Sequence, residues 1–246
     1  EWPTATLDIL GEDARDQLIR AYCGWLVTAQ GSGNANAGEL AENTVRLVRN
    51  NAALSALAGN PLMACLIAQS GEATREGEAP RDRASVCLGS VRTILRRPIA
   101  DDLPLGGVAR LELLGALAAW FQENGYVVAA NSDVEAFLPA TRHGTTLPAD
   151  QLREALVEHT GLLTYEPGGM SFQFRALQHA LAANHLVRTA RFGFLASVAH
   201  RAEWRDVVED ALCLATGPAR RALTARLVAA AAQKPVIRDR YDLRSG

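Results

Sequence analysis

Apolar residues recur at intervals of three and four positions along most of the chain, which is the spacing of one face of an α-helix. In the first segment, Leu18, Tyr22, Trp25 and Leu26 form such an apolar face. Glycine and proline residues divide the pattern into short segments. Helices are predicted over residues 12–30, 39–50, 52–58, 62–68, 111–121, 133–138, 149–159, 176–190, 192–199, 203–215 and 219–233, with one more after Pro80.

Two short runs interrupt this helical spacing. Residues 162–166 and 170–174 alternate like strands, and Pro167-Gly168-Gly169 lies between them, so they predict a β-hairpin. Three predicted helices precede the hairpin, and this order is that of a winged helix. The chain is therefore expected to be mainly α, with a helical domain followed by a winged-helix domain that carries one β-hairpin. The further helices after Arg191 would be the first units of an α-solenoid, which usually needs about three repeats.

The clearest break in the pattern is the segment from Pro98 to Gly107, where prolines and glycines lie among acidic residues. It is predicted as a domain boundary. The expected units are a lid-like helical domain over 1–105, a winged-helix domain over 106–190 and a helical extension over 191–246.

Composition narrows the classes of partner. The chain has 25 basic and 27 acidic residues and a formal net charge of −2, without the cationic excess that non-specific nucleic-acid binding needs. The third helix of the predicted winged helix, which would enter a DNA groove, carries Asp150, Glu154 and Glu158 against Arg153 alone. We therefore do not expect a nucleic-acid partner. The longest apolar runs fall far short of the roughly 20 residues that span a bilayer, so no membrane helix is expected either.

The sequence offers no recognisable catalytic or metal-binding constellation. His179 and His185 are six residues apart, not the four that would place two zinc ligands on one helical face. The four cysteines show no C-x-x-C spacing and are predicted to be buried, reduced thiols. The glycine-rich stretch 31–38 lacks the Gly-Lys-Ser/Thr that a phosphate-binding loop requires. No catalytic residue is predicted.

Four segments, taken in order, nevertheless resemble a known family. They are Gly59-Asn60-Pro61-Leu62-Met63, Pro80-Arg81-Asp82-Arg83-Ala84, Gly161-Leu162-Leu163 and the run from Phe172 to Ala183. Their order and spacing resemble the region that follows the core of NACHT-type STAND signalling ATPases, from about residue 4 to residue 204. The resemblance implies that residues 4–10 are the last strand of a nucleotide-binding core, followed by its helical and winged-helix domains.

The resemblance also implies candidate nucleotide contacts at Gly59, Pro61, Phe174 and Arg175. The family's Gly-x-Pro turn places its proline on the adenine, which here is Pro61, although a proline in this position can also simply begin a helix. A winged-helix histidine that contacts the β-phosphate of ADP corresponds to Phe174, whose phenyl ring cannot donate a hydrogen bond. Either Arg175 supplies a cation instead, or the closed state is held by packing without a phosphate contact.

These residues contain no Walker A loop and no strand that ends in paired acidic residues, so hydrolysis is not expected from them alone. The chain begins with Glu1 and is predicted to be a piece of a longer, cytoplasmic ATPase of bacterial defence or regulation. ADP or ATP with Mg²⁺ would be held only with an upstream P-loop domain. The expected partners are that upstream nucleotide-binding domain, further copies of the protein on activation, and an effector or sensor partner. The alternatives are a nucleotide-independent helical scaffold or protein-interaction module and, third, a winged-helix transcription regulator.

Overall fold

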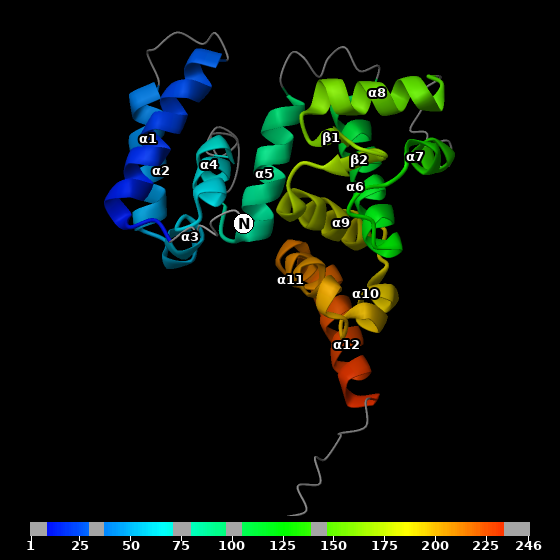
Figure 1. The fold of residues 1–246 in the computed structure, drawn as a ribbon. Coiled ribbons are helices and arrows are strands. Elements are labelled where there is room, and N and C mark those ends of the chain that lie inside the picture. The colour runs from blue at the N-terminus through cyan, green and yellow to red at the C-terminus, as the bar shows by residue number, and fades with distance from the viewer. Residues whose placement is uncertain (1–8, 30–36, 71–79, 97–104, 139–146, 234–246) are drawn as a thin grey trace, which may run out of the picture.

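A computed structural model describes residues 9–29, 37–70, 80–96, 105–138 and 147–233. This part of the chain is mainly helical and has one antiparallel hairpin, which confirms the predicted fold class (Figure 1). The elements are α1 (Glu12–Ala29), α2 (Ala37–Arg49), α3 (Ala52–Leu57), α4 (Pro61–Ser70), α5 (Arg83–Leu95), α6 (Gly107–Asn124), α7 (Asn131–Phe137), α8 (Ala149–Thr160), β1 (Leu163–Glu166), β2 (Gly169–Phe172), α9 (Arg175–Arg188), α10 (Phe192–Val198), the 3-10 turn η5 (Ala202–Trp204), α11 (Arg205–Leu214) and α12 (Gly217–Gln233).

In the first unit, α1 packs against α2 and α4, and α4 packs against α5. The prediction of which residues of α1 face the core is partly wrong. Ile19, Cys23 and Leu26 are fully buried, whereas Trp25 is 55% exposed and its ring lies 5.5 Å from that of Tyr22. The buried stripe is therefore centred one position away from the predicted one. A large indole can cover a neighbouring ring at the surface without entering the core.

The second unit has the element order of a winged helix, with α6, α7 and α8 followed by β1 and β2. Glu166 pairs with Gly169 across the two-residue turn Pro167-Gly168, and Gly168 adopts a φ of +93° that favours glycine. Ala129, between α6 and α7, exchanges two backbone hydrogen bonds of 2.9 Å with Met170 of β2. It therefore adds a short third segment beside the hairpin.

Two sequence details of the hairpin are corrected. The second strand begins at Gly169, where an added Cβ would lie 1.9 Å from the carbonyl oxygen of Ala129, so only glycine fits. It ends at Phe172 and not at residue 174, because the chain turns at Phe174 to begin α9. Phe174 is therefore the N-cap residue of a helix and not part of a strand.

Helix α9 lies at the centre of the described chain and packs against α6, α5 and α11 (Figure 1). Its contact with α6 is close, since an added Cβ on Gly115 would lie 3.2 Å from the Cβ of His185. Buried apolar residues form one continuous cluster that runs from α1 to α12. The predicted helical and winged-helix units therefore share a core through α5, while most of the predicted boundary lies outside the described residues.

The last helices form an extension in which α10 packs against α12, and α11 packs against α9 and α5. Trp204 is buried at the start of α11 and meets the ring of Phe194 edge-on at 5.1 Å. The assignment of this extension to a separate third unit stays a prediction, as does its assignment to an α-solenoid. Among the described helices, none is long and apolar enough to cross a membrane.

Candidate functional site

The first pair of predicted nucleotide contacts, Gly59 and Pro61, lies at the start of α4. The side-chain oxygen of Asn60 accepts hydrogen bonds from the backbone N–H groups of Leu62 and Met63, at 2.9 and 3.3 Å, and so caps the helix. Pro61 is the first residue of α4, where the absence of an N–H costs nothing. This residue is half-buried, so part of it stays accessible at the helix end.

Gly59 lies directly against the chain that leads into α1. The backbone N–H of Leu10 donates a 2.8 Å hydrogen bond to the carbonyl oxygen of Gly59. An added Cβ on Gly59 would lie 2.5 Å from Cγ2 of Ile9, a contact that cannot form without movement. The segment before α1 is therefore held directly on the Gly-Asn-Pro turn.

The second pair of predicted contacts begins α9. Phe174 is the N-cap residue, with an extended backbone, and its half-buried ring packs against the hydrophobic core. Arg175 is the first helical residue and is exposed. A cation at a helix N-terminus is unfavourable, because the N-terminal end of the helix dipole is also positive. An anion bound here would be stabilised both by the guanidinium of Arg175 and by the helix dipole of α9. Arg175 fits a phosphate contact chemically, and Phe174 does not.

The four predicted residues form two separate pairs. Gly59 and Pro61 lie at the start of α4, whereas Phe174 and Arg175 lie at the start of α9. Helix α5 lies between α4 and α9 and packs against both (Figure 1). A nucleotide that met both pairs would have to bridge two helices on opposite sides of α5.

A polar cluster that the sequence did not predict joins α5, α9 and α11. It consists of Arg83, His179, Asp206 and Asp210, and is called the Arg83 cluster below. Nε and Nη2 of Arg83 donate to Oδ1 of Asp210 at 3.1 and 3.0 Å. Nη1 of Arg83 lies 3.2 Å from Oδ1 of Asp206, and Nδ1 of His179 lies 3.3 Å from Oδ2 of the same carboxylate.

Local structure positions each member of this cluster. Asp82 caps α5 by accepting a 2.8 Å hydrogen bond from the backbone N–H of Ser85, whose hydroxyl accepts in return from the N–H of Asp82. This capping box places Arg83 at the first position of α5. Asp206 and Asp210 are four residues apart and so lie on one face of α11.

Burial sets the protonation behaviour of the cluster. Removal from water raises the pKa of Asp210 from 3.8 to about 6, and the neighbouring Arg83 only partly opposes this rise. Burial also lowers the pKa of His179 below 6.5, against the attraction of Asp206. At neutral pH the imidazole of His179 is therefore neutral.

Sequence reasoning could have found half of the Arg83 cluster. Arg83 lies in the second of the four segments that carry the family resemblance, and the aspartates show the four-residue spacing of one helical face. The pairing itself spans 127 positions, and no local pattern connects Arg83 to Asp210.

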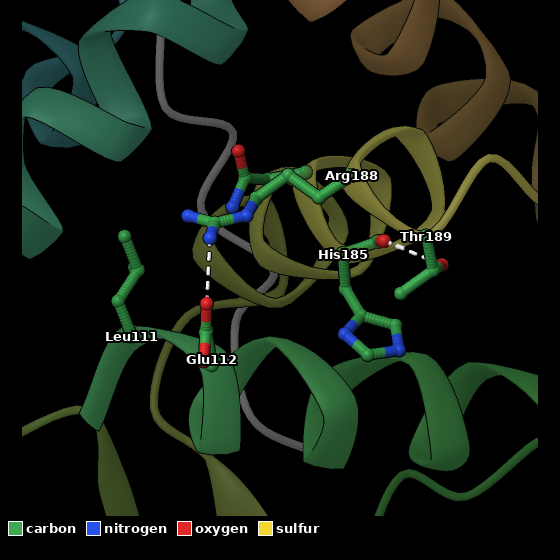
Figure 2. A pocket seen from close by; sticks show the side chains of 6 residues that line it. Leu111, Glu112, His185, Arg188 and Thr189 are labelled. Carbon is green, nitrogen blue, oxygen red and sulfur yellow. Dashed lines mark hydrogen bonds and ion pairs between the residues drawn. The ribbon is translucent and has the colours of Figure 1, made fainter. Parts of the chain in front are cut away.

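A separate hollow of about 270 Å³ lies between α6 and α9 (Figure 2). An ion pair of 2.6 Å between Arg188 and Glu112 crosses it. Within α9, the hydroxyl of Thr189 donates a 2.7 Å hydrogen bond to the carbonyl oxygen of His185. None of the four predicted nucleotide contacts lines this hollow. Since its charged groups already pair with each other, the hollow favours no particular ligand.

Helix α8 presents an acidic surface. Asp150, Glu154 and Glu158 are exposed. Arg153 is buried, and its Nε donates a 2.9 Å hydrogen bond to Glu135. The helix that would face phosphates therefore exposes acidic groups, as the sequence predicted.

The thiols are only partly as predicted. Cys23 and Cys87 are buried, Cys65 is half-buried, and Cys213 is exposed, so the prediction of four buried thiols is wrong for two of them. Burial raises the pKa of Cys87 to about 12, which leaves its thiol protonated and unreactive in this structure. In the described part of the chain, no group of three or more His, Cys, Asp or Glu side chains could hold a metal ion.

Comparison of the chain with protein-family models, with curated proteins and with solved structures finds no match.

Proposed function

We propose that the chain is the regulatory nucleotide-switch and oligomerisation module of a NACHT-like STAND signalling ATPase, acting in bacterial defence or regulation. In this function an upstream P-loop domain holds ADP or ATP with Mg²⁺. The present chain contacts the nucleotide from its two helix starts and self-associates on activation. The activity, its cytoplasmic location and its effector or sensor partner all belong to this proposal.

The observation that carries the proposal is the Gly59–Pro61 turn. The segment before α1, which the resemblance assigns to the end of the nucleotide-binding core, is hydrogen-bonded to Gly59 through Leu10. Pro61 follows two residues later and is half-buried, so part of this residue is accessible. A nucleotide held by a domain that enters at Ile9 would therefore lie next to an apolar proline ring, which suits a flat base.

Arg175 gives independent support. It is an exposed cation at the start of a 14-residue helix, and within the described residues it takes part in no recorded hydrogen bond or ion pair. A phosphate in this position would meet the guanidinium and the backbone N–H groups of α9 together. Arg175 would then act in place of the histidine that Phe174 replaces.

The test is nucleotide retention by the full product of the encoding gene, which should also contain G-x-x-x-x-G-K-S/T upstream of Glu1. The purified protein is expected to carry ADP, measured by chromatography of the denatured supernatant. Pro61→Ala and Arg175→Ala should each lower the retained ADP by about tenfold, the loss expected for one good contact.

Matched controls come from α12. Pro218→Ala changes another proline in the first turn of a helix, and Arg221→Ala changes another exposed arginine. Both should leave ADP retention unchanged. A gene without the upstream motif, or Pro61 and Arg175 variants that retain ADP as the wild type does, would refute the proposal.

The packing of Phe174 favours a second candidate, a nucleotide-independent helical scaffold or interaction module. Its ring lies against the core, so it holds α9 in place without any ligand. A full gene product that carries no nucleotide would support this candidate. The third candidate, a winged-helix transcription regulator, requires duplex-DNA affinity that falls steeply with salt, and the exposed carboxylates of α8 weigh against it.

A further inference from the structure

Helix α5 meets its two sets of neighbours with different chemistry. Toward α4 the contact uses small residues at short range. An added Cβ on Gly89 would lie 3.0 Å from the Cβ of Ser70, and the hydroxyl of Ser90 donates a 2.8 Å hydrogen bond to the carbonyl oxygen of Leu66. Both serines are fully buried. Toward α11 the contact adds the guanidinium of Arg83 to the shared apolar core.

Arg83 donates to three acceptors on α11. Besides the carboxylates of Asp210 and Asp206, its Nη2 donates a 3.1 Å hydrogen bond to the backbone carbonyl oxygen of Asp206. His179 of α9 meets the far oxygen of Asp206. One arginine at the start of α5 therefore joins the first predicted unit to the extension, beside the central helix of the second.

The Arg83 cluster is incompletely satisfied. Within the described residues, Oδ2 of Asp210, Nε2 of His179 and Nε2 of neighbouring Gln178 are buried without a hydrogen-bond partner. Groups of this kind regain water when the helices separate, so separation returns much of what their burial costs. On the α4 side the buried hydroxyls of Ser70 and Ser90 already have acceptors, and the close contact of Gly89 with Ser70 depends on dispersion at short range, so water returns less there.

We propose that Arg83 is a latch. Its contacts with Asp206 and Asp210 hold α5 on α11, and when they release, α5 leaves α9 and α11 and stays with α4. This deepens the proposed function by naming the contact on which a nucleotide switch would act. The latch itself is a property of the described helices and needs no nucleotide.

Cys87 gives a local readout of this latch. It lies one turn after Arg83 on α5, is fully buried, and feels the charges of both Asp210 and Arg83. Release of α5 from α11 would expose this thiol and return its pKa toward the ordinary value, so alkylation would accelerate. Cys23 in α1 is equally buried and reports unfolding of the chain as a whole.

The experiment measures alkylation by iodoacetamide at each cysteine, by peptide mass spectrometry, in the absence of nucleotide. Arg83→Ala should label Cys87 about tenfold faster than the wild type, as expected for the loss of a charged hydrogen-bond network, while Cys23 is unchanged. Arg83→Met, which fills most of the same space but has no hydrogen-bond donor, should do the same.

Arg205→Ala is the matched control, since it breaks an exposed ion pair with Glu209 that lies wholly within α11. It should leave Cys87 labelling at the wild-type rate. The latch is refuted if Cys87 stays protected in both cluster variants, or if Cys23 accelerates together with Cys87. Because no nucleotide is present, either outcome leaves the ADP-retention test to decide the proposed function separately.

Discussion

The two sides of α5 show how one helix can be fixed on one side and releasable on the other. Toward α4 the described contacts are neutral, and the helices approach closely at Gly89. Toward α9 and α11 the contact includes a guanidinium, two carboxylates and an imidazole. Close apolar packing loses its dispersion energy as soon as a gap opens, whereas charged groups exchange each other for water. The difference predicts which interface persists when the chain changes shape.

The largest expected effect comes from disturbing the α4 side. Gly89→Leu should lower the free energy of unfolding by about 1–3 kcal/mol, because the new side chain must displace Ser70 in a tightly packed interface. Chemical denaturation measures this change. Gly24→Leu in α1 is the control, since a Cβ there meets no atom within 4 Å, and it should be neutral or stabilising by up to about 1 kcal/mol through helix propensity. Equal effects of the two variants would contradict the distinction.

The second effect is pH-dependent and belongs to the α11 side. Burial raises the pKa of Asp210 from 3.8 unfolded to about 6 folded, so the folded chain binds this proton more tightly. The resulting stabilisation is present below about pH 4 and is lost as the pH rises through about 6. Asp210→Asn removes it. Between these pH values the wild type should therefore lose on the order of 2 kcal/mol more stability than the variant.

Thermal and chemical unfolding at several pH values tests this sign. Asp210 faces Arg83 and Asp82 of α5 and Asp206 of α11, and these charges stay in place in the variant. His179 contributes with the opposite sign, because burial lowers its pKa, but it is present in both proteins and so largely cancels. Parallel pH profiles for wild type and Asp210→Asn would show that Asp210 is not the buried, raised-pKa group.

The smallest effect concerns the single hydrogen bond across the α4 side. Ser90→Ala removes the donor to Leu66 and should cost about 1 kcal/mol of unfolding free energy. Ser197→Ala removes an exposed hydroxyl whose hydrogen bond stays within α10, and should be close to neutral. If both serine variants left the free energy of unfolding unchanged, the buried hydrogen bond from Ser90 to Leu66 would not stabilise the contact between α4 and α5.

The helices were predictable because their signal is local. A period of three to four residues, capped by residues such as Asn60 and Asp82, needs no knowledge of distant contacts. The hairpin was predictable for the same reason, from Pro167 and Gly168. The position of Phe174 was not, because a residue that ends a strand-like run can equally cap the next helix.

The candidate site was less accessible to sequence reasoning. The Gly59–Pro61 turn was found through an ordered resemblance and not through local physics, since a proline at a helix start is common. The pairing of Arg83 with Asp210 links residues 127 positions apart, which only the packing of α5 on α11 brings together. The exposure of Trp25 likewise depends on which helices cover α1.

Native-state hydrogen exchange of the unaltered chain in low denaturant tests most directly whether α5 belongs with α4. The account predicts that amides in α5 and α4 share one opening free energy, distinct from the one that governs α9 and α11. If the α5 amides instead open together with those of α9 and α11, and separately from α4, the assignment of a fixed and a releasable side is contradicted.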